Sequence, residues 1–109
     1  MPTGENQAAL YRLLGDRHHM HVDPAAARAA GQPRPFLHGL CTLAAVLFPI
    51  ADEAGAHPSD LRTLSSRFAG PVFPGDVVEV GVRPGETAVG FEASVGDRPV
   101  LTGGEVRFR

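Results

Sequence analysis

The sequence holds a single cysteine, Cys41, among its 109 residues. One cysteine cannot form a disulfide within the chain, and it cannot build a cage of thiolates around a metal ion. We therefore expect a reducing compartment, the cytoplasm. Cys41 falls inside an apolar stretch, and such a residue behaves as a small hydrophobic side chain of the core rather than as a nucleophile.

Positive charge and long apolar runs are also scarce. Ten Lys and Arg residues against twelve Asp and Glu give a net charge of -2, which provides no field to attract nucleic acid. The longest apolar stretch, Leu40 to Ala51, is interrupted by Thr42 and Pro49, and it is shorter than the roughly 20 residues that span a bilayer. The amino terminus lacks the basic start and apolar run of a secretory signal. Nucleic-acid binding, membrane insertion and export are therefore not expected.

Length and composition fit one domain that spans residues 1–109, with helices in its first half. Capping residues and glycines set the bounds of three predicted helices. These are Thr3 to Gly15 with Thr3 or Asn6 as the cap, Pro24 to Ala30 before Gly31, and Gly39 to about Glu53 before Gly55. The third helix is the longest and is expected to bury a face made by Leu40, Leu43, Ala44, Leu47 and Ile50. It is apolar on more than one face, so a contact with another subunit is expected as well.

The second half of the chain alternates apolar and polar residues, which predicts strands. Four are expected, in the ranges 61–69, 78–82, 89–95 and 100–108. In the last strand, Val100, Thr102, Val106 and Phe108 should share one side. The segment GPVFPGD, Gly70 to Asp76, should be an ordered turn. Helices followed by a meander of antiparallel strands indicate an α+β domain in which the long helix covers one face of the sheet.

Titratable side chains are concentrated in one predicted loop, GDRHHMHVD, residues 15–23. A carboxylate and an imidazole a few residues apart in a turn can face one water molecule, so that one group takes its proton and the other donates to a substrate. Asp16 and His21 suit that arrangement. By residue type alone, a solvated surface turn is the more common explanation of such a cluster.

A second motif, PFLHGL, spans Pro35 to Leu40 and opens the longest predicted helix. The first N–H groups of a helix have no partner within it. A thioester oxygen that gains negative charge would be stabilised there by the amide of Gly39 and by the helix dipole. The alternative is that Gly39 only relieves crowding between helix and sheet, and spacing does not separate the two interpretations.

Together the two motifs resemble the MaoC-like dehydratases, and in particular the type 2 (R)-specific enoyl-CoA hydratases. Their pattern is Y-x-L-S-G-D-x-N-P-L-H-x-D-P followed by P-I-L-H-G-L, and the chain has YRLLGDRHHMHVDP and PFLHGL. RFAGPVFPGD, Arg67 to Asp76, resembles a later segment of that family. The resemblance implies that Asp16 and His21 are the catalytic pair and that Gly39 supplies the amide of an oxyanion hole.

The resemblance also implies a hotdog fold, in which an antiparallel sheet wraps around one long helix. The implied reaction is (R)-specific hydration of trans-2-enoyl thioesters, or the reverse dehydration, on a coenzyme A or acyl carrier protein thioester and without a further cofactor. His38, Tyr11 and His18 are expected to contribute to substrate binding. Where the family pattern has Asn-Pro, this chain has His18 and His19, and Leu14 replaces a small Ser.

The chain also begins close to the first helix of the motif, without the strand that precedes it in single-hotdog hydratases. It therefore resembles the catalytic half of a double-hotdog hydratase. We expect a homodimer, or a heterodimer with another hotdog subunit.

Three other functions are weighed at this point. Four histidines between His18 and His38 raise the possibility of a metal site, but the H-H-x-H spacing is not an established ligand pattern, so no metal is expected. A subunit that binds acyl thioesters without turning them over would fit the change at His18 and His19. A hotdog thioesterase is the third alternative.

Overall fold

The computed structural model describes the whole chain, residues 1–109. Its helices are α1 (Gln7–Tyr11), α2 (Pro24–Ala29) and α3 (Gly39–Ala54), and its 3-10 turns are η1 (Arg12–Leu14), η2 (His19–His21) and η3 (Pro58–Asp60). Its strands are β1 (Leu61–Phe68), β2 (Glu79–Arg83), β3 (Val89–Val95) and β4 (Arg98–Phe108). The predicted order of helices followed by strands is confirmed. None of the helices has both the length and the apolar character needed to cross a membrane.

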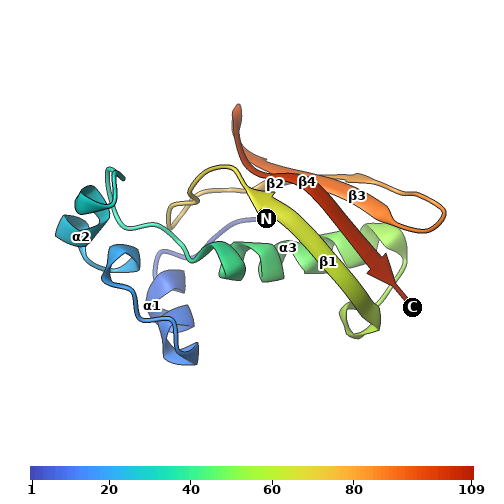
Figure 1. Ribbon diagram of the computed structural model, residues 1–109, viewed down its shortest axis with the longest axis horizontal. Coiled ribbons are helices and arrows are strands. Elements are labelled where there is room, and N and C mark those ends of the chain that lie inside the picture. The colour runs from blue at the N-terminus through green and yellow to red at the C-terminus, as the bar shows by residue number, and fades with distance from the viewer.

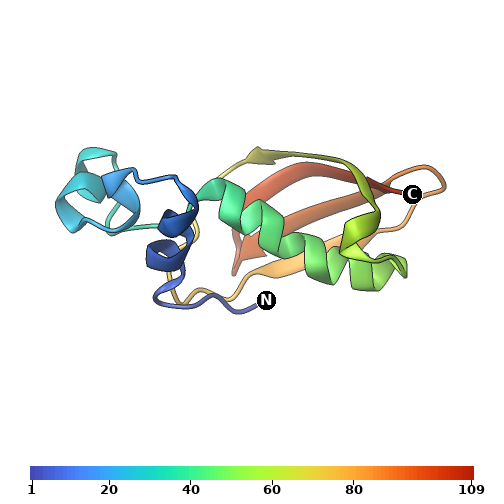
Figure 2. The same cartoon turned by 90° about the horizontal axis from the view of Figure 1, so that it is seen from below.

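The four strands form one antiparallel sheet in the order β1-β4-β3-β2. Helix α3 runs across one face of the sheet, as both views show (Figures 1 and 2). The short helices α1 and α2 extend beyond one end of the sheet (Figure 1). This arrangement is the predicted α+β hotdog fold, and it puts the first turn of α3 at the junction between the sheet and the short helices.

The core lies between α3 and the sheet. Twelve buried residues form one cluster, and the helix contributes Leu43, Val46 and Ile50 to it. Phe91 of β3 is the largest fully buried side chain. It faces Gly104 of β4 in the ladder, where an added Cβ would lie 2.6 Å from the Phe91 ring. Gly104 is therefore required by the size of its cross-strand neighbour.

The buried face of α3 is rotated from the predicted one. Leu43 and Ile50 are buried as expected, but Leu40 and Ala44 are exposed. The buried set on the helix is Cys41, Thr42, Leu43, Val46, Ile50 and Ala51. Because the helix is apolar on more than one side, the sequence pattern did not determine which side faces the sheet.

Two further predictions are corrected. The Thr3 hydroxyl does not cap α1: it donates to the Asp76 carbonyl at 2.6 Å, because residues 2 and 3 pair with the chain just before β2. Asn6 takes the cap position without a side-chain bond. The alternation in β4 is also interrupted, since Gly103 has a φ of 59° and Thr102 is only partly buried. By contrast, the ordered turn before β2 is confirmed by the bond from the Asp76 amide to the Phe73 carbonyl.

Replacement of Leu101 tests where the core lies. Leu101→Ala is expected to lower the free energy of unfolding by about 2–5 kcal/mol, because the side chain is 1% exposed in β4. Leu13→Ala makes the same chemical change at a side chain that is 73% exposed, and it should shift the value by less than about 0.5 kcal/mol. Urea unfolding of both variants measures the difference, and equal losses would contradict this core.

Candidate active site

The loop between α1 and α2 brings three polar side chains to one place. Gly15, with a φ of 125°, ends η1 and turns the chain into the loop. The loop then makes one 3-10 turn that ends at His21. One ligand-type atom from each of Asp16, His21 and His38 lies within 4.8 Å of the others. Asp16 and His21, predicted as a pair from the motif, are thus neighbours in space, and His38 joins them from the start of α3.

His21 is the buried member of the pair, at 5% exposed. Its Nδ1 lies 2.8 Å from the Phe36 carbonyl oxygen, and a carbonyl only accepts, so Nδ1 carries the hydrogen and Nε2 keeps a free lone pair. Burial lowers the pKa of His21, and the bond to Phe36 only partly opposes that effect. At neutral pH the ring is therefore an uncharged base whose free nitrogen has a defined position.

His38 holds this part of the site together. It is 1% exposed, its ring stacks on His21 with centroids 3.8 Å apart, and its Nε2 donates to the Asp16 carbonyl at 3.0 Å. The Tyr11 ring also packs against His38, with ring centroids 4.7 Å apart. Tyr11 thus supports the loop through its ring, and its hydroxyl makes no hydrogen bond with the chain. The Nδ1 atom of His38 is buried without a partner.

Asp16 is the accessible member, with a side chain 41% exposed. Its Oδ1 accepts from His18 Nδ1 at 2.6 Å and from the His18 backbone N–H at 3.3 Å. The His18 side chain, and then its backbone N–H, lower the pKa of the Asp16 carboxyl below its usual value. Asp16 is consequently a carboxylate at neutral pH, and its Oδ2 makes no hydrogen bond within the chain.

Asp16 and His21 are close enough to share one water molecule. Two acceptors that each lie about 2.8 Å from one water oxygen are about 4.5 Å apart when the angle between them is near tetrahedral. The carboxylate and imidazole atoms lie within 4.8 Å of each other. A water can therefore donate one hydrogen to each group.

A cation could in principle use the same donor types, a carboxylate and two imidazoles. The His21 and His38 rings, however, stack face to face with planes 26° apart. The in-plane lone pairs of stacked rings run side by side and do not converge on one point. The arrangement suits a bound water better than a metal ion.

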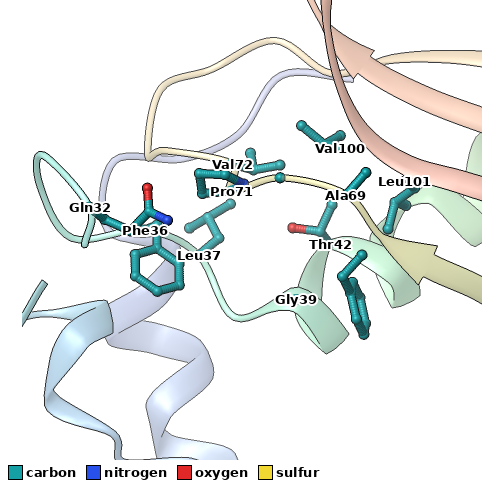
Figure 3. A pocket seen from close by; sticks show the side chains of 12 residues that line it. Gln32, Phe36, Leu37, Gly39, Thr42, Ala69, Pro71, Val72, Val100 and Leu101 are labelled. Carbon is teal, nitrogen blue, oxygen red and sulfur yellow. The ribbon is translucent and has the colours of Figure 1, made fainter. Parts of the chain in front are cut away.

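The amide of Gly39 opens α3 immediately after His38, at the wall of a cavity of about 280 Å³. Figure 3 shows this cavity between the first turn of α3 and the segment after β1. Gly39 is exposed, but an added Cβ would lie 3.0 Å from the Phe68 ring. Both sequence interpretations of Gly39 thus have support: the residue relieves crowding, and its N–H belongs to the first helical turn.

The cavity is not lined by Asp16 or His21. Phe36 contacts both regions. Its ring lines the cavity (Figure 3), and it also packs edge-on against His21, with centroids 4.9 Å apart. His18 is exposed, contacts Asp16 and does not line this cavity. The predicted site residues therefore divide between a polar hollow around Asp16 and an apolar cavity beside Gly39, joined by the stack of His21 on His38.

Two residues of this region were not predicted from the sequence. Phe36 orients His21 through its carbonyl oxygen, and a main-chain group leaves no signal in residue type. Thr42, one turn into α3, is buried and lines the cavity (Figure 3). Its place after the PFLHGL motif could have drawn attention to it, but Thr in an apolar helix is most simply explained as a core residue.

Comparison with known proteins places the whole chain in one group. The family model described as MaoC like domain matches residues 1–106. The chain is 43% identical over 105 residues to peroxisomal multifunctional enzyme type 2 of Drosophila melanogaster, covering 95% of this chain and 17% of that protein. It is 38% identical over 117 residues to 3-hydroxyacyl-thioester dehydratase Y of Mycobacterium tuberculosis, covering 99% of this chain and 40% of that protein.

Solved structures show the same similarity. A MaoC-like dehydratase from Phytophthora capsici superposes with a TM-score of 0.91 at 30% identity, over all of this chain and 40% of that one. Full-length multifunctional enzyme type 2 from Drosophila melanogaster superposes with a TM-score of 0.87 at 39% identity, over all of this chain and 21% of that one. The chain thus spans less than half the length of these relatives.

The protonation state of His21 provides a test of this geometry. At pH 6.5, where an ordinary imidazole is half protonated, most of His21 is expected to be neutral with the hydrogen on Nδ1, because burial lowers its pKa and Phe36 accepts from Nδ1. Nitrogen-15 NMR of the histidine side chains distinguishes the two tautomers and the cation. A largely protonated ring at pH 6.5, or a hydrogen on Nε2 of the neutral ring, would contradict the arrangement.

Proposed function

Because the chain belongs to the MaoC-like dehydratase family, we propose that it adds water to trans-2-enoyl thioesters, or removes water from (R)-3-hydroxyacyl thioesters. The observation that carries the proposal is the neighbouring pair of Asp16 and His21, a carboxylate and a neutral imidazole close enough to share one water. Enzyme names of relatives, among them 3-hydroxyacyl-thioester dehydratase Y, support the reaction class.

In this mechanism the pair holds one water molecule. His21 Nε2 takes a proton as the general base, while Asp16 accepts the other hydrogen and fixes the direction of attack. The hydroxide adds to Cβ of the alkene, and the proton held by the pair then passes to Cα on the same face. The hydroxyl group and the hydrogen thus add to the same face of the double bond, which is a syn addition. Dehydration is the reverse sequence of the same steps.

Gly39 is assigned to the thioester. Negative charge develops on the thioester oxygen as the hydroxide adds, and a backbone N–H at the start of α3 is aimed to stabilise that charge without reorganisation. The dipole of a 16-residue helix adds to the effect. The cavity beside Gly39 is suited to the handle next to the thioester, the pantetheine of coenzyme A or of an acyl carrier protein. His38 and Tyr11 then serve the substrate indirectly, by supporting His21.

The proposed reaction requires no further cofactor. Addition of water changes no oxidation state overall, and the pair both removes and returns the proton. We also retain the cytoplasm as the compartment for a chain with a single cysteine, which is buried. Residues 1–109 are treated as one MaoC-like hotdog domain.

A second hotdog unit is proposed as the partner, either another copy of this chain or a related subunit. Leu40 and Phe48 are exposed about two turns apart along α3, and Phe68 is exposed at the end of the edge strand β1. Exposed apolar side chains grouped in this way are typical of protein interfaces. The greater length of the relatives agrees with a site completed by additional structure.

An assay of the purified chain tests the reaction. The chain is expected to consume a short trans-2-enoyl-CoA, followed as loss of enoyl absorbance, and to yield the (R)-3-hydroxyacyl product. Asp16→Asn and His21→Ala should each reduce turnover to near background. His21→Ala removes the base, and Asp16→Asn replaces the free carboxylate oxygen by an amide N–H, which donates and cannot accept from the water. Circular dichroism of both variants checks that the fold is retained.

Further measurements on the purified chain separate the alternatives. Sedimentation of the native assembly shows whether the active species is a monomer or a pair of hotdog units. Release of a free thiol, detected with a thiol reagent, would indicate a thioesterase. Binding without turnover, either alone or with a hotdog partner, would leave only the non-catalytic subunit. Near-full activity of either variant would overturn the assignment of the pair.

A comparison of two substitutions at Gly39 isolates the contribution of its N–H. Gly39→Ala and Gly39→Pro both place a Cβ against Phe68, but only proline removes the hydrogen-bond donor, and proline is tolerated at the first position of a helix. Gly39→Pro should therefore lose about 10²- to 10³-fold more in kcat than Gly39→Ala, as expected for one oxyanion donor. Equal losses in the two variants would assign Gly39 to packing alone.

A further inference from the structure

His18 is bound to Asp16 in a way that the reaction scheme does not use. The Nδ1 of its imidazole lies 2.6 Å from Asp16 Oδ1, and its backbone N–H lies 3.3 Å from the same oxygen. One residue thus contacts a single carboxylate oxygen twice. The backbone of His18 is in turn fixed by its position as the first residue before η2.

This contact determines which oxygen of Asp16 is available. With Oδ1 held by His18, and with His38 Nε2 on the same side at 3.9 Å, the carboxylate group cannot rotate freely. Oδ2 has no partner within the chain and is the atom left for a water. A small misplacement of a catalytic group, of about 1 Å, costs on the order of a hundredfold in rate, so a carboxylate on an exposed loop gains from being held.

We propose that His18 is a positioning residue that orients the Asp16 carboxylate for the water and couples it to the charge of a second imidazole, through the two contacts with Oδ1. This inference rests on the proposed function and deepens it. His18 occupies the place where the family pattern has asparagine, so the expected consequence is specific to this chain: a dependence on pH that a neutral amide at position 18 cannot provide.

The electrostatic surroundings support a direct effect of His18 on Asp16. The His18 side chain is the largest influence that lowers the pKa of Asp16, and His38 adds a smaller one. Arg17 and His19 flank His18 on the open hollow around Asp16. From the buried side, the groups that face the pair are His21 and His38. Of these neighbours, His18 alone forms a side-chain hydrogen bond with the carboxylate.

Three variants separate the hydrogen bond from the charge. In His18→Asn, the amide Nδ2 stands the same number of bonds from Cβ as Nδ1 of histidine, so it can donate to Asp16 but does not change charge with pH. His18→Ala removes both the bond and the charge. His19→Ala is the matched control, because His19 is exposed in the same loop and its side chain makes no hydrogen bond with the chain.

The variants should differ in kcat and in the shape of the pH profile. His18→Ala is expected to lose about 10- to 100-fold in kcat with little change in KM, because His18 acts on Asp16 and not on the substrate. In His18→Asn, kcat should stay within about threefold of the wild-type value, which is a much smaller change than the loss expected for His18→Ala. The pH profile of His18→Asn should differ from that of the wild type, because an amide at position 18 has no charge to change. His19→Ala should resemble the wild type in both respects.

Carbon-13 NMR of the Asp16 carboxyl group provides a measurement that needs no turnover. In the wild type its shift should change between pH 5 and 8 while Asp16 stays ionised, and this change should be absent in His18→Asn and present in His19→Ala. If the wild type shows this change but no enoyl thioester is turned over, the proposed function fails and the coupling stands. If the shift is flat, or if His18→Ala keeps the kcat and the pH profile of an active wild type, the role of His18 is overturned.

Discussion

The stack of His21 on His38 is the contact on which the site depends. His38 is the residue that precedes α3, and its ring is buried between Tyr11 and His21 while its Nε2 donates to the Asp16 carbonyl. Through this one side chain, the position of the loop follows from the position of the helix, and the position of the helix follows from burial of its face against the sheet. Stacking and one hydrogen bond contribute only about 1 kcal/mol each, so the core must supply the rest of the stability.

His21 and Asp16, the two groups of the proposed pair, are in different environments, and this difference favours a different protonation state in each. His21 is desolvated and neutral, with its free nitrogen directed by Phe36. Asp16 is accessible and ionised, with one oxygen held by His18. A base that stays uncharged near pH 7 and a carboxylate with one free oxygen together accept both hydrogens of a water. Burial of His21 and the contacts of His18 with Asp16 both favour these states.

Much of the fold was predictable because it depends on local chemistry. Gly15, Gly31 and Gly55 end helical segments with positive φ, as expected from sequence, and alternating residues predicted the strands to within a few positions. The face that α3 buries was not predictable, since a helix that is apolar on several sides has no single preferred orientation until a sheet is present. The interruption in β4 follows from Gly103 and from the fit of Phe91 against Gly104, which are cross-strand effects.

The site was predictable in its members but not in its contacts. The motif indicated Asp16, His21 and Gly39, yet the bond of His18 to Asp16 and the ring packing of Tyr11 depend on side-chain directions that residue order does not determine. The remaining feature is exposure: the Asp16 side chain is 41% exposed. Hydrogen bonds to a developing charge are worth more when water is excluded. A site with one wall open therefore reaches its full effect only when the substrate, or a second hotdog unit, covers that wall.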